Sequence, residues 1–183
     1  SSSGLPSASG AILATAGIGL VNVIMTVVSM WLIDRVGRRP LLLVGTGGMV
    51  ITLGALGLLF RTNMHGGSLA MFAVVFLMAY VACFAIGLGP IFWLLMSEIY
   101  PLKIRGEASG TAAGTNWVFN FLVSLTFLTL VQVMGAGDSF WLYGLLSVAA
   151  WIFCYTLVPE TKGRTLEEIE ASWHKRRHRH AAS

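Results

Sequence analysis

Residues 34–40 read Asp34-Arg35-Val36-Gly37-Arg38-Arg39-Pro40, and this short charged stretch interrupts two long runs that carry no charge. The run before it, residues 1–33, and the run after it, residues 41–60, contain no Asp, Glu, Lys or Arg. A charged side chain at the centre of a bilayer costs at least about 2.5 kcal/mol. The pattern is therefore typical of two membrane-spanning helices joined by a solvated loop.

The same alternation continues to the end of the chain, where residues 62–97, 108–137 and 139–159 are also uncharged. A helix that rises 1.5 Å per residue needs about 20 apolar residues to cross about 30 Å of hydrocarbon, and each run can supply them. We predict an all-α membrane protein with five transmembrane helices, near residues 11–33, 41–60, 69–96, 108–134 and 140–158. Residues 1–10 are then the remnant of an external loop, 11–158 a transmembrane helix bundle, and 159–183 a tail.

The cations predict the orientation of this bundle. Eleven of the twelve Lys and Arg residues lie within 34–40, 97–107 and 160–180, and the remaining one, Arg61, lies in an alternate loop. Loops rich in Lys and Arg stay in the cytoplasm. We therefore expect a multi-pass protein of the cell membrane, with the N-terminus of this chain outside and its C-terminus cytoplasmic.

The composition excludes several other classes. A chain that is 56% hydrophobic and 11% charged is not disordered. Its net charge of +4 follows from the bias of the inner loops, so it predicts no nucleic-acid partner. The five predicted spans contain no acid and no His, which argues against an enzyme with catalytic residues at membrane depth. Cys83 and Cys154 are interpreted as packing residues, and we expect no metal site and no cofactor.

The loop at 34–40 resembles the Asp-x-x-Gly-Arg-Arg loop of the major facilitator superfamily. Four later segments resemble the sugar porter branch of that superfamily: Gly87-Leu88-Gly89-Pro90-Ile91-Phe92-Trp93, Ser97-Glu98-Ile99-Tyr100-Pro101 with Arg105-Gly106, Asn116-Trp117, and Pro159-Glu160-Thr161-Lys162-Gly163-Arg164-Thr165. Their order and spacing are similar to the C-terminal half of such a transporter, from just before helix eight through helix twelve.

The resemblance implies a carrier of two six-helix halves, which binds a monosaccharide between them and moves it by alternating access. Helices one to seven are missing, so the expected partners are a monosaccharide substrate (hexose, pentose or related polyol), the lipid bilayer and the N-terminal half of the same transporter. The absence of an initiator Met and the odd helix count also indicate a piece of a longer protein. Two alternatives are a sugar sensor on the same fold and a truncated membrane fragment that does not transport.

Uncharged amides near the middle of the spans are candidates for binding sugar hydroxyls. Asn22 lies in the first predicted span, and Asn116 and Asn120 lie four residues apart on one face of the fourth. An amide in hydrocarbon needs a partner, which is either a ligand or a neighbouring helix. The resemblance implies that Asn22 and Asn120 contact sugar, while both interpretations stay open for Asn116.

Gly87, Gly89 and Pro90 predict a break or kink between residues 86 and 90, because proline has no N–H and clashes with the preceding turn. Broken helices at membrane depth occur where they line protein or water, and transporters bind substrate there. A plain packing kink is the alternative. The resemblance places Trp93 on the inner side of the sugar pocket as a stacking and gating residue, with Phe84 as a further lining candidate.

The predicted inner loops carry charges of both signs, which we interpret as a network that forms when the carrier faces outward and breaks when it opens inward. The alternative is a set of solvated loop charges, of which each exposed pair contributes about 0–1 kcal/mol. Some passive glucose facilitators carry Glu at the position of Ala85, so its absence here favours a proton-coupled porter. The members of the network are Asp34, Arg35, Arg38, Arg39, Glu98, Arg105, Glu160 and Arg164.

Overall fold

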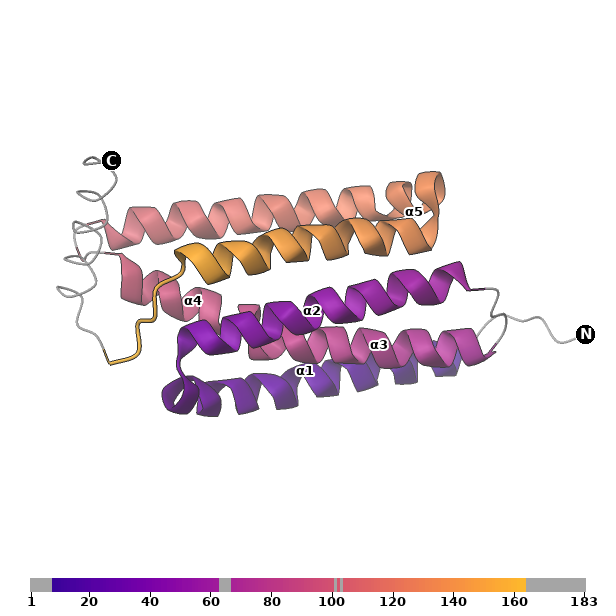
Figure 1. The fold of residues 1–183 in the computed structure, drawn as a ribbon, viewed down its shortest axis with the longest axis horizontal. Coiled ribbons are helices and arrows are strands. Elements are labelled where there is room, and N and C mark those ends of the chain that lie inside the picture. The colour runs from indigo at the N-terminus through magenta and orange to yellow at the C-terminus, as the bar shows by residue number, and fades with distance from the viewer. Residues whose placement is uncertain (1–7, 63–66, 101, 103, 164–183) are drawn as a thin grey trace, which may run out of the picture.

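The computed structural model describes residues 8–62, 67–100, 102 and 104–163, and it arranges them as an up-and-down bundle of helices (Figure 1). The helices are α1 (Ala8–Val36), α2 (Arg38–Arg61), α3 (Gly67–Ile86), α4 (Leu88–Ile99) and α5 (Arg105–Leu157). Within the described residues four helical segments are long and apolar enough to cross a membrane, and the third of them combines α3 and α4. The predicted all-α membrane fold is confirmed.

The longest segment, α5, contains two helices. Its 53 residues would extend over about 80 Å if they were straight, against about 30 Å of hydrocarbon. Gly135 has φ 86° and ψ 161°, a conformation that glycine adopts far more easily than other residues, and the chain reverses there. Figure 1 shows the two arms of α5 side by side. We call residues 105–134 the first arm and residues 136–157 the second arm, and each is long enough to cross the membrane.

The helix break lies at Gly87, between α3 and α4 and inside the stretch predicted from sequence. Gly87 has φ −96° and ψ −91°, which ends the regular turn of α3. Ser29 of α1 donates a hydrogen bond from its hydroxyl to the carbonyl oxygen of Ile86 at 2.7 Å. This bond satisfies a backbone acceptor at the end of α3, so the neighbouring helix stabilises the break.

Helix α2 is the centre of the bundle and packs against both α3 and α5. Gly45 of α2 meets Gly87 so closely that a Cβ on Gly45 would lie 2.6 Å from the Gly87 Cα. On the α5 side, Trp151 donates its indole N–H to the carbonyl oxygen of Leu43 at 3.1 Å. Small residues allow this approach, because helices in a membrane associate through close packing and polar contacts.

Two faces of the bundle expose large apolar side chains, one on α1 and one on the first arm of α5. A chain that lies in lipid or packs on further helices is expected to have such faces. The exposed residues include Ile12, Leu13, Leu20, Val23, Ile24 and Val27 on α1, and Trp117, Phe119, Phe121, Leu125 and Leu128 on the first arm.

Candidate functional site

The three asparagines lie on two different helices. Asn22 is half-buried on α1, while Asn116 is half-buried and Asn120 exposed on the first arm of α5. The side-chain amide of Asn120 donates to the backbone carbonyl oxygen of Asn116 at 2.9 Å. This local bond leaves the side-chain oxygen of Asn120 available as an acceptor for a hydroxyl.

The two aromatic candidates flank the helix break. Phe84 precedes it on α3 with 38% of its surface exposed, and Trp93 follows it on α4 with 49% exposed. The Trp93 ring meets the edge of Phe92 at a centroid distance of 5.2 Å. Within the described residues no hydrogen bond or ring contact joins Trp93 to an asparagine on α1 or α5, and a common site for the five candidates stays a prediction.

The described members of the predicted network lie at one end of the bundle, which we call the charged end. At this end α1 and α4 end, α2 begins and the second arm of α5 ends. Arg38 is its central residue. Its guanidinium donates to a Glu98 carboxylate oxygen at 2.8 Å and lies 4.0 Å from the carboxylate of Asp34. The other oxygen of Glu98 accepts a hydrogen bond from the Thr161 hydroxyl at 2.6 Å. These bonds connect α1, α2, α4 and the segment that follows α5.

Glu160 caps the first turn of α2, a role that the sequence did not predict. Its two carboxylate oxygens accept hydrogen bonds from the backbone N–H groups of Arg38 and Arg39, both at 3.0 Å. A carboxylate in this position satisfies unpaired N–H groups and interacts favourably with the helix dipole. Gly37, with φ 105°, makes the approach possible, because a Cβ there would lie 2.8 Å from a Glu160 oxygen.

Three other arginines of the predicted network bind neutral groups. Arg39 donates to the carbonyl oxygen of Tyr155 at 2.6 Å. Arg105 donates to the carbonyl oxygen of Tyr100 at 3.1 Å. The guanidinium of Arg35 lies 3.9 Å from the centre of the Trp31 ring. Among the described residues these three side chains make no ion pair with a carboxylate, and their place in the charge network stays a prediction. Arg164, the last predicted member, lies outside the described residues.

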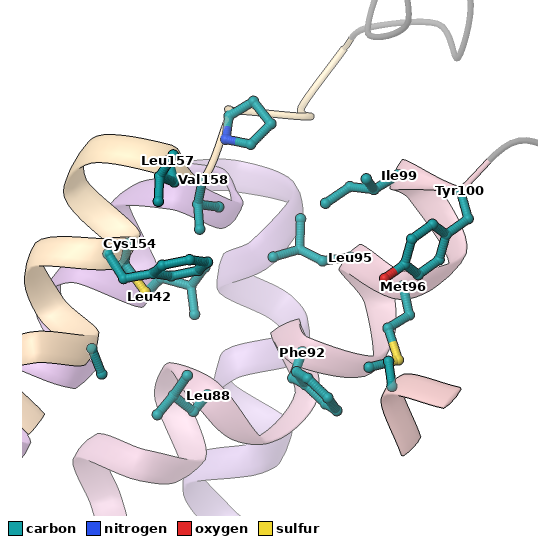
Figure 2. Close-up of a pocket in the computed structure, with 14 residues that line it drawn as sticks. Leu42, Leu88, Phe92, Leu95, Met96, Ile99, Tyr100, Cys154, Leu157 and Val158 are labelled. Atoms are coloured by element: carbon teal, nitrogen blue, oxygen red, sulfur yellow. The ribbon is translucent and has the colours of Figure 1, made fainter. Parts of the chain in front are cut away.

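An apolar cavity of about 570 Å³ lies beside the charged end, between α2, α4 and α5 (Figure 2). Figure 2 shows Leu157 and Val158 on one side of it, with Ile99 and Tyr100 on the other. Its walls offer few groups that could bind a sugar hydroxyl. The further lining residues are Leu42, Leu88, Phe92, Leu95, Met96, Ala112, Ala150, Phe153, Cys154 and Pro159.

The chain is similar to known transporters over almost its whole length. The family described as "Sugar (and other) transporter" matches residues 2–173. Polyol transporter 5 of Arabidopsis thaliana is 42% identical over 163 residues, which are 87% of this chain and 30% of that protein. The D-xylose-proton symporter of Escherichia coli K12 is 41% identical over 169 residues, which are 89% of this chain and 34% of that protein. The chain therefore spans about a third of the length of these curated relatives.

The fold of the chain is also similar to solved structures of a sugar transporter. The proton:xylose symporter XylE bound to 6-bromo-6-deoxy-D-glucose superposes with a TM-score of 0.82 and is 40% identical, over 91% of this chain and 36% of that one. The inward open conformation of the xylose transporter XylE from E. coli superposes with a TM-score of 0.78 at 40% identity, over 89% of this chain and 36% of that one.

Proposed function

We propose that the chain, which belongs to the family of sugar (and other) transporters, forms most of one half of a membrane carrier for a monosaccharide or a polyol. The observation that carries this proposal is the likeness of nine tenths of the chain to a xylose symporter solved with a sugar analogue bound. Since the chain spans only about a third of such a carrier, it supplies part of the sugar site, and the missing first half supplies the rest. The carrier works by alternating access and performs no covalent chemistry.

The proposed sugar contacts are the two kinds of group that suit a hydroxylated ring. Asn22, Asn116 and Asn120 offer amide donors and acceptors, and Trp93 and Phe84 offer aromatic faces. All five side chains are half-buried or exposed, as expected for residues that await the opposing half of the carrier. A sugar held between the halves would complete the hydrogen bonds that these amides lack on their own helices.

The proposed moving part is α4. Gly87 separates it from α3, and Gly89 and Pro90 lie in its first turn, so α4 can change its angle at this break. At its far end Glu98 binds Arg38 and Thr161, and these bonds tie α4 to the rest of the charged end. We place this end in the cytoplasm on the basis of the cation bias. Breaking the Glu98 bonds would then accompany opening to the cytoplasm.

Any proton coupling would rely on the missing half. The described helical segments place a small buried residue, Ala85, at the position where some facilitators carry Glu, and the predicted spans contain no Asp or Glu. A proton carrier at membrane depth normally needs such a side chain. We therefore propose that the protonated group of any symport mechanism lies in the first half.

Uptake by a completed carrier tests the proposal. The first half of the E. coli xylose symporter, helix seven included, is fused in front of this chain, and uptake of labelled D-xylose, hexoses and polyols is measured in cells that lack other carriers. We expect saturable uptake of at least one of these compounds by the fusion and none above background by the chain alone. The intact E. coli symporter is the positive control. A fusion that reaches the membrane and binds sugar without moving it would favour the sensor interpretation instead.

A further inference from the structure

The carbonyl oxygen of Ile86 is the acceptor that the helix break leaves without its regular partner. In a continuous α-helix this carbonyl would accept a hydrogen bond from the backbone N–H four residues later, at the position of Pro90. Proline has no N–H, so that donor is missing. An unpaired carbonyl away from water costs free energy comparable to a lost hydrogen bond. The break is therefore stabilised by a donor from another helix.

Ser29 of α1 supplies this donor. Its hydroxyl lies 2.7 Å from the Ile86 carbonyl oxygen, and 0% of the residue is exposed, so solvent does not reach the bond. The hydroxyl of Thr26, one turn earlier on the same helix, has a different role. It donates within α1 to the carbonyl oxygen of Asn22 at 2.8 Å, and that carbonyl also has the N–H of Thr26 as its regular helical partner. Of these two hydroxyls, only that of Ser29 joins α1 to the break.

Helix α2 holds the other side of the break by close packing. A Cβ on Gly87 would lie 3.0 Å from the Gly45 Cα and 3.3 Å from the Leu41 carbonyl oxygen, so the break lies directly against the backbone of α2. Packing of this kind has no preferred direction, whereas a hydrogen bond orients the group that it holds. The Ser29 bond is therefore the contact that sets the orientation of the Ile86 carbonyl.

The same bond connects the two helices that carry Asn22 and Trp93, two of the proposed sugar contacts. Asn22 lies seven residues before Ser29, which is about two helical turns, so both residues lie on one face of α1. Trp93 lies on α4, six residues after Gly87. A change in the angle of α4 at the break therefore moves Trp93 relative to Asn22, while Ser29 stays at the point where the two helices are joined.

We propose that Ser29 is a positioning residue of the carrier, the pivot about which α4 turns at the Gly87 break. Its hydroxyl keeps the Ile86 carbonyl on α1 while the far end of α4, where Glu98 binds Arg38, changes position. Ser29 acts through the orientation of α4 and does not contact the sugar. This role rests on the proposed function, in which α4 is the moving part, but the hydrogen bond behind it can be tested without transport.

A double-mutant cycle tests the hydrogen bond in the full chain, by unfolding in mixed micelles titrated with SDS. Ser29→Ala should raise the unfolding equilibrium constant by about 5 to 150-fold, because a buried acceptor loses its donor. In a Pro90→Ala background residue 90 regains an N–H for the Ile86 carbonyl, so the same substitution should change the constant by less than about threefold. Thr26→Ala is the matched control and should have a small effect in both backgrounds.

Equal effects of Ser29→Ala in the two backgrounds would overturn the proposal, because Ser29 would then only fill space. If Ser29→Ala alone fails to fold, adding Pro90→Ala should restore folding, and failure of both variants would contradict the proposal as well.

Uptake by the completed carrier tests the positioning role. In the fusion with the first half of the E. coli xylose symporter, Ser29→Ala should lower the maximal rate about tenfold and change the sugar KM less than about twofold, because the side chains of Asn22 and Trp93 remain. Thr26→Ala should transport like the parent fusion. A Ser29→Ala fusion with an unchanged maximal rate, or with a raised KM alone, would overturn the positioning role. A parent fusion without any uptake would instead refute the proposed function and leave the result of the unfolding cycle intact.

Discussion

A methyl group added at Gly45 should separate the helices that meet at the break. The Cβ of Gly45→Ala would lie 2.6 Å from the Gly87 Cα and 2.7 Å from the Cys83 carbonyl oxygen. Both are backbone atoms, so no side chain can rotate away. Ordinary carbon contacts lie at about 3.5–4.0 Å, so α2 and α3 must move apart by about 1 Å. We expect overpacking of this kind to cost about 1–3 kcal/mol of the free energy of unfolding.

Gly54→Ala in the same helix is the matched control, because a Cβ at Gly54 meets nothing within 4 Å. Alanine is favoured over glycine inside a helix by about 1 kcal/mol, so this variant should be neutral or slightly stabilised. The two substitutions are chemically identical, so the helix-propensity gain cancels and the variants should differ by the overpacking cost of about 1–3 kcal/mol. The measurement is unfolding in mixed micelles titrated with SDS, followed by tryptophan fluorescence. If Gly45→Ala is as stable as Gly54→Ala, the close contact between α2 and the break does not exist.

Two further predictions concern the charged end and the orientation of the bundle. Glu160→Gln should lower the free energy of unfolding by about 1–2 kcal/mol, because the carboxylate that caps α2 loses its charge; an unchanged value in the same SDS titration would show that the cap contributes nothing. In intact cells and in a Cys-free background, Ser68→Cys should react with an impermeant thiol reagent added outside, whereas Lys162→Cys should react only after the membrane is opened. The opposite pattern would reverse the proposed orientation.

Charge spacing alone was enough to predict the membrane fold. Residues such as Asp34 and Glu98 bound uncharged runs that are long enough to span a bilayer. In lipid the backbone N–H and C=O groups of such a run must be hydrogen-bonded within the protein, and a helix is the common structure that does this. The break was also predictable, since Gly87, Gly89 and Pro90 act locally through backbone geometry. The exact position of the break also depends on Gly45, which packs against Gly87, and on Ser29, which binds the Ile86 carbonyl oxygen. Both residues are distant in sequence and reach the break only in the folded chain.

The cap formed by Glu160 was not predictable in the same way. Its partner Arg38 lies 122 residues earlier, and nothing in the local sequence of either residue specifies the pairing. One signal was present: α2 begins after Gly37, which has no side chain to cap a helix, so its first N–H groups needed an acceptor from elsewhere. The sugar contacts of Asn22 and Asn120 stay predictions, because the chain spans only about a third of the transporters it is similar to.

Equilibrium sugar binding to the completed carrier tests the central claim most directly. Losing a hydrogen-bond partner in a semi-buried site costs about 1–3 kcal/mol, so Asn22→Ala and Asn120→Ala should each raise the Kd by about 5 to 150-fold. Trp93→Ala should also weaken binding, because it removes an aromatic surface for the ring. The control is Thr126→Ala on the same arm as Asn120, whose hydroxyl already binds the Leu122 carbonyl oxygen. If both asparagine variants bind sugar as tightly as the Thr126 control, these amides only pack helices, and the proposed sugar site is wrong.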